Sequence, residues 1–95
     1  MPTFTLSLGR TDQGIRSVKD APKRAEASKE LARKVGVEIK EVYLTSGDND
    51  ILLILDAPDE DNVAKFALGA LGNVRTRTCR VWPFEEYMKL ISELP

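Results

Sequence analysis

Apolar and small hydroxyl side chains alternate at the start of the chain. Phe4, Leu6 and Leu8 lie two residues apart, and the positions between them carry threonine or serine. This period of two predicts a β-strand that ends at Gly9 and has one apolar face and one mildly polar face. The polar face of this strand consists of Thr3, Thr5 and Ser7.

Two later segments repeat their apolar residues at spacings of three and four, which is typical of amphipathic helices. The first follows Asp20, a candidate N-cap, and ends at Gly36. The second follows Asp59 and ends at Gly72. Pro83 begins a terminal helix with apolar residues on one side. Residues 15–18 could form a further short helical piece.

Three more strands are expected. Residues 37–45 alternate, but the alternation slips by one near Glu41, which predicts an edge strand with a bulge. Residues 51–55, ILLIL, follow a turn signature at residues 46–49 and are apolar on both faces. Residues 74–82 form the last strand.

The predicted order of elements is β, α, β, β, α, β, α. It predicts an α+β fold, a ferredoxin-like βαββαβ unit plus a C-terminal helix, as a single domain over residues 1–95. The four strands then form an antiparallel sheet with both main helices on one face, and the first and third strands lie in its centre.

The apolar segment 51–55 indicates that the second face of the sheet is covered as well. The terminal helix could cover part of this face. Packing of a second copy sheet to sheet covers it more completely, so we expect a homodimer or a larger symmetric oligomer.

Composition removes several kinds of chemistry. The chain has no histidine and one cysteine, which excludes an imidazole base and the common zinc sites. The six glycines lie singly, so the nucleotide-binding loops rich in glycine are absent. The acidic residues between Ser46 and Ala64 are interpreted as turn and helix-capping residues. We therefore expect no metal and no cofactor.

The charge balance also limits the partners. The chain has 14 basic and 15 acidic residues, and the basic residues of the first long helix are mixed with acidic ones. This pattern predicts a solvated helix face and binding to neither nucleic acid nor membrane. One cysteine permits no internal disulfide, and no signal peptide is visible, so we expect a cytoplasmic protein. Cys79 itself is expected to be a small buried residue of the last strand.

Four motifs in order resemble the GYD domain family, whose members are small bacterial and archaeal proteins of the dimeric α/β-barrel superfamily. They are the segment 11–36, TSGDND at 45–50, APDED at 57–61 and LGNVRTRT at 71–78. The Gly-x-Tyr-Asp turn of the family corresponds here to residues 47–50, with Asn49 in place of the tyrosine. The resemblance implies an oligomer and supplies no reaction.

Candidate ligand contacts come from four kinds of side chain, which are guanidinium, hydroxyl, aromatic and amide. Arg75 and Arg77 lie two residues apart on the last strand, so they share a face and could bind a carboxylate or phosphate. More often, charges on an edge strand discourage wrong strand pairing or form an ion pair between subunits. The small hydroxyls of the first strand indicate a pocket between the sheets. The full set of candidates is Thr5, Ser7, Tyr43, Asn49, Arg75, Arg77 and Trp82.

Three functions remain open from the sequence. The favoured one is an oligomeric binding or regulatory module that takes a small metabolite, with an acid as one candidate, in a cavity between subunits; an enzymatic role is left open. The second is a cofactor-free monooxygenase or isomerase of the dimeric α/β-barrel kind, in which the aromatic residues and Asn49 would contact the substrate. The third is a structural or partner-binding protein.

Overall fold

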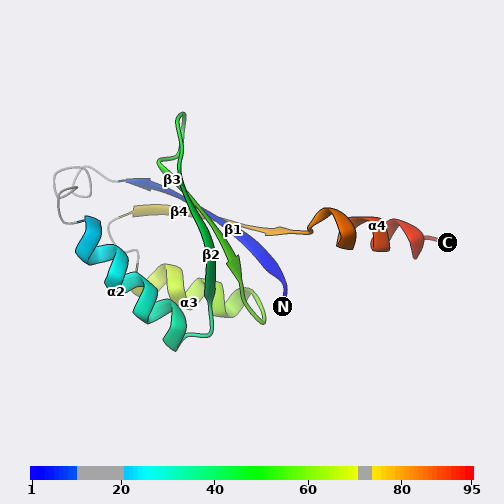
Figure 1. Cartoon of the computed structure of the whole chain (residues 1–95), viewed down its shortest axis with the longest axis horizontal. Helices are drawn as coiled ribbons and strands as arrows, with labels where there is room; N and C mark the ends of the chain where they lie inside the picture. Colours follow the sequence, from blue (N-terminus) through cyan, green and yellow to red (C-terminus); the bar gives the residue numbers. More distant parts are fainter. Residues whose placement is uncertain (11–20, 71–73) are drawn as a thin grey trace.

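A computed structural model describes residues 1–10, 21–70 and 74–95. The described strands form one antiparallel sheet in the order β2-β3-β1-β4. Helices α2 and α3 lie together on one side of this sheet (Figure 1). The strands are β1 Thr3–Arg10, β2 Glu38–Leu44, β3 Ile51–Asp56 and β4 Val74–Val81, and the helices are α2 Ala21–Lys34, α3 Glu60–Ala70 and α4 Phe84–Ser92. The ferredoxin-like fold with β1 and β3 in the centre is thereby confirmed. The helical piece predicted at residues 15–18 lies outside the described residues.

The core lies between the two central strands and the two packed helices. Phe4 pairs with Leu55 and Leu6 with Leu53, so the apolar sides of β1 and β3 face the helices together. Phe66 of α3 fills the space above them and is fully buried. The alternation of the first strand therefore decides which face of the sheet forms the core.

The helix ends are held by local hydrogen bonds. The backbone N–H groups of Asp61 and Asn62 donate to Oδ1 of Asp59 at 2.9 and 3.3 Å, so Asp59 caps α3 as predicted. Asn62 Nδ2 donates to the carbonyl of Val35 at 2.9 Å and ties the start of α3 to the end of α2. Gly36 has φ of 79°, which favours glycine and ends α2 where the sequence predicts.

Strand β2 lies at an edge of the sheet and carries the predicted irregularity. Ile39 pairs with Leu55 and Glu41 with Ile54, so Lys40 is an extra residue between the two pairs. One extra residue inverts the alternation of the residues that follow it. The bulge thus decides which face Tyr43 occupies.

Helix α4 does not pack on the sheet. It begins after Pro83 and stands away from the other elements, beyond the end of β4 (Figure 1). None of its residues is buried. The expected cover of the second sheet face by the terminal helix is therefore not found among the described residues.

Candidate functional site

The sheet face opposite to α2 and α3, here called the open face, brings most of the predicted ligand contacts together. Ser7 of β1 lies between Leu52 of β3 and Arg77 of β4. The next row of this face places Thr5 between Ile54 and Cys79. Arg75 lies opposite Gly9, and Tyr43 of β2 lies opposite Leu52. Five of the seven candidate residues, Thr5, Ser7, Tyr43, Arg75 and Arg77, therefore share this face.

The centre of the open face combines apolar and hydroxyl side chains. Leu52 and Ile54 are half-buried, as are Thr5 and Ser7 beside them. The two hydroxyl side chains are much shorter than the leucine and isoleucine side chains of β3 beside them. The face is therefore lower along β1 than along β3, which leaves space for a ligand if another surface packs over it.

The two edges of the open face carry opposite charges. Arg75 and Arg77 are exposed on β4 at one edge. Glu41 is exposed on β2 at the other edge and accepts a hydrogen bond from the hydroxyl of Tyr43. Sequence reasoning did not select Glu41 as a site residue. The slip in the alternation of β2 was the signal for it, because the bulge at Lys40 places Glu41 and Tyr43 on the open face.

Asp56 is a second carboxylate near this acidic edge, but it already has partners. Thr3 Oγ1 donates to Asp56 Oδ1 at 2.9 Å across the β1–β3 pair. The ammonium of Lys40 lies 3.9 Å from Asp56 Oδ2 and 3.4 Å from Glu38 Oε1. These contacts leave Glu41 as the carboxylate that faces outward beside Tyr43.

Asn49 lies in the turn between β2 and β3, at the end of the sheet where Arg75 also lies. Its backbone carbonyl accepts a hydrogen bond from Thr45 Oγ1 at 2.6 Å, and the N–H of Asp50 donates to the carbonyl of Leu8 at 2.8 Å. The turn is therefore tied to β1 near Gly9, the residue that pairs with Arg75. Asn49 lies at the margin of the open face and not within its rows.

Trp82 does not belong to the open face. Its ring lies under the guanidinium of Arg80, with Cζ 4.6 Å from the ring centroid. Arg80 pairs with Phe4, and its guanidinium also lies 5.7 Å from the centroid of that core ring. Trp82 thus extends the side of β4 that faces the helices, because residues two apart in a strand share a face.

Cys79 is exposed, and the expectation that it is buried is wrong. It pairs with Thr5 on the open face, where no described helix covers β4. A strand residue is buried only if another layer packs on its face. In this chain α2 and α3 both lie on the other face.

Within residues 1–10, 21–70 and 74–95, no group of three or more cysteine, aspartate or glutamate side chains could hold a metal ion. No helix in the described part of the chain is long and apolar enough to cross a membrane.

Comparisons with known proteins agree with this architecture. The chain is 33% identical over 86 residues to a Thermus thermophilus protein named "Glutamine synthetase and cystathionine beta-lyase binding protein", and the match covers 87% of this chain and 90% of that one. Its fold is similar to the crystal structure of MtbAldR, with a TM-score of 0.65 and 13% identity. That match covers 86% of this chain and 53% of the other, so the chain spans about half the length of that solved structure. The model of the GYD domain matches residues 5–91. The chain therefore belongs to the GYD domain family.

Proposed function

We propose that this protein is a homodimeric binding module that holds a small acidic metabolite between the open faces of two copies. The observation that carries the proposal is the pairing of Ser7 with Arg77 on the open face. A hydroxyl and a guanidinium side by side can hold a carboxylate or phosphate through charge-assisted hydrogen bonds. Arg75 lies two residues away on the same face and can add a second cationic contact.

The apolar residues at the centre of the open face support the dimer. Leu52 and Ile54 are only half-buried in a single chain, and α4 stands away from them. Full burial of a leucine or isoleucine side chain contributes about 1.5–3 kcal/mol relative to full exposure. Because Leu52 and Ile54 are already half-buried, their burial in a dimer would contribute part of this free energy. A second copy that packs sheet to sheet buries both residues on each side of the interface.

The charges at the two edges favour one orientation of the dimer. A twofold axis parallel to the strands places β4 of one copy over β2 of the other at the same height, so Arg77 lies over the row of Tyr43 and one row from Glu41, while Arg75 lies two rows from Glu41. An axis across the strands would instead place each edge over its own copy, with like charges together. In the favoured orientation Arg77 is the arginine near the carboxylate of Glu41, and Arg75 keeps its positive charge for an anionic ligand.

Binding is favoured over catalysis by the surroundings of the two hydroxyls. The direct cross-strand neighbours of Ser7 are Leu52 and Arg77, and those of Thr5 are Ile54 and Cys79. None of these four is a carboxylate or an imidazole. A serine or threonine without an adjacent base is a weak nucleophile but a good hydrogen-bond donor.

Thermal unfolding in the presence of succinate, glutamate or inorganic phosphate tests the proposal. A ligand that binds only the native state, present at a concentration about 100 times its Kd, stabilises that state by about 2.7 kcal/mol and so raises the Tm. Replacement of Arg75 and Arg77 together by alanine should remove this stabilisation. Lys65→Ala, which removes an exposed positive charge on α3, is the control and should keep it. A stabilising acid whose effect survives the double arginine replacement would rule out these contacts.

A second candidate is binding to metabolic enzymes. It rests on the Thermus thermophilus relative, which is named for binding glutamine synthetase and cystathionine β-lyase. Mixing this chain with purified glutamine synthetase from its own organism, followed by sedimentation, tests it. A complex that forms without any acid ligand would favour this candidate over the first one.

A further inference from the structure

Helix α4 is an amphipathic helix that buries none of its residues against the described part of the chain. Its apolar residues recur at helical spacing on one side, and its charged residues lie on the other. The apolar side chains are Phe84, Tyr87, Met88, Leu90 and Ile91, which are 37–71% exposed. The chain measures 52 × 31 × 17 Å, and its radius of gyration is 14.7 Å, compared with about 12 Å for a compact domain of this length. An apolar helix surface of this kind is normally buried in the working state of a protein.

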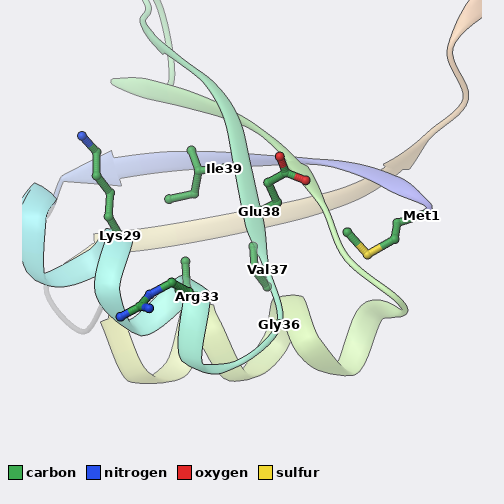
Figure 2. A pocket seen from close by; sticks show the side chains of 8 residues that line it. Met1, Lys29, Arg33, Gly36, Val37, Glu38 and Ile39 are labelled. Atoms are coloured by element: carbon green, nitrogen blue, oxygen red, sulfur yellow. The ribbon is translucent and has the colours of Figure 1, made fainter.

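A pocket of about 370 Å³ lies on the helix-covered side of the molecule, beside edge strand β2. Met1, Ala32, Val37 and Ile39 provide its apolar lining, and Gly36 leaves it open at the end of α2. Figure 2 shows Lys29 and Arg33 extending from α2 at one side of this pocket and Met1 at the other. A small-molecule site requires several polar groups that converge on one point, and this pocket has few. It suits apolar side chains better than a metabolite.

The charges beside the two surfaces are complementary at Lys29 and Arg33; the third charged lining residue, Glu38, already contacts the ammonium of Lys40. The polar side of α4 carries Glu85 and Glu86 in its first turn and a single cation, Lys89. Lys29 and Arg33 at the pocket pair with Glu26 and Glu30 of their own helix, but all four side chains are at least half exposed. Exposed pairs of this kind contribute little to stability, so they can exchange for a new partner. An acidic helix is also a poor ligand for an anionic membrane surface.

The sheet topology places the pocket of a second copy within reach of α4. One row across the sheet joins the end of β4 to the start of β2. In this row Val81 of β4 pairs with Thr3 of β1, and Thr3 pairs with Asp56 of β3. Asp56 in turn pairs with Glu38 of β2. The end of β4 and the start of β2 therefore lie at the same end of the sheet but at opposite edges. A twofold axis parallel to the strands brings the start of β2 of one copy next to the end of β4 of the other.

We infer that α4 of each copy docks, with its apolar side, into the pocket beside α2 and β2 of the second copy, so that two helices clasp the dimer reciprocally. This inference rests on the sheet-to-sheet dimer proposed above, because that dimer brings the pocket to the base of α4. Its own chain cannot supply the pocket, since α4 points away from it (Figure 1). The clasp lengthens the lifetime of the dimer without contributing to the ligand cavity.

Disulfide trapping between two different chains tests the clasp. Both chains carry Cys79→Ser; one carries Ile91→Cys on the apolar side of α4, and the other carries Ile39→Cys in the pocket. Mixing and mild oxidation should give a covalent heterodimer on a non-reducing gel. Lys89→Cys, on the opposite side of α4, is the matched control and should give at least tenfold less covalent heterodimer. A disulfide to Ile54→Cys on the open face instead of Ile39→Cys would overturn the inference.

Sedimentation separates failure of the clasp from failure of the dimer. Met88→Glu together with Ile91→Glu should raise the dimer Kd at least tenfold, and Lys89→Glu should leave it unchanged. Both changes lie on exposed positions, so the fold should be retained by circular dichroism. A dimer whose Kd is insensitive to the double change overturns only the clasp. An unmodified chain that sediments as a monomer at micromolar concentration overturns the dimer and the clasp with it.

Discussion

Ser7 of β1 and Arg77 of β4 are direct cross-strand partners on the sheet face that no described helix covers. The two residues are 70 positions apart in the chain, and only the antiparallel pairing of β1 with β4 makes them neighbours. Their chemistry is complementary to a carboxylate or phosphate, and their surroundings contain Leu52 and Ile54, which favour burial. The same face therefore carries groups that favour binding of an acid and apolar residues that favour packing of a second copy.

The apolar row of the open face should control the dimer. Ile54→Glu places a charge at the centre of the expected interface, and burial of that charge without a partner is costly. We expect the variant to sediment as a folded monomer at concentrations where the unmodified chain is a dimer. Leu68→Glu is the matched control, because Leu68 lies on α3 and is 84% exposed. Equal dimerisation of both variants would place the interface elsewhere.

The opposite charges at the two edges should set the orientation. Arg77→Glu places an acidic side chain opposite the acidic edge of the second copy. The repulsion should raise the dimer Kd about tenfold. Glu41→Arg alone should weaken the dimer in the same direction. The chain that carries both changes restores opposite charges across the interface and should recover most of the lost affinity. Additive losses in the double variant, measured by sedimentation at low salt, would contradict the parallel twofold axis.

Cys79 should report on the dimer by its reactivity. It is exposed in a single chain but lies on the open face, opposite Thr5. Its rate of labelling by a thiol reagent should therefore fall as protein concentration rises through the dimer Kd. The monomeric Ile54→Glu variant should be labelled rapidly at every concentration. A rate that does not depend on concentration in the unmodified chain would show that the open face stays uncovered.

Asn62 should stabilise the junction of the two packed helices. Asn62→Ala leaves the carbonyl of Val35 without its side-chain donor and removes a hydrogen bond at the start of α3. We expect a loss of about 1–2 kcal/mol in the free energy of unfolding. Lys65→Ala, one turn further along α3 and exposed, should change it by less than about 0.5 kcal/mol. Urea denaturation of both variants provides the measurement, and equal midpoints would contradict the tie between the helices.

Local signals in the sequence predicted the elements and their faces. The alternation of β1 separates Phe4 from Thr5, and the slip near Glu41 marks the bulge of β2, because the period of a strand is a local property. Asp59 caps the start of α3 and Gly36 ends α2, and both act within a few residues of the chain. The order of the elements then places β1 and β3 in the centre, because short connections permit few arrangements.

Tertiary structure decided which of these faces meet. Tyr43 joins the row of Ser7 and Arg77 only because β2, β3, β1 and β4 lie side by side in that order. Trp82 stacks on Arg80 and so lies away from the open face, where most of the other candidate residues lie. Cys79 is exposed because both packed helices lie on the other face. Burial depends on what packs against a residue, and no local pattern contains that information. The amphipathic pattern after Pro83 accordingly predicts a helix, but only the fold shows that α4 leaves its own domain with its apolar side uncovered.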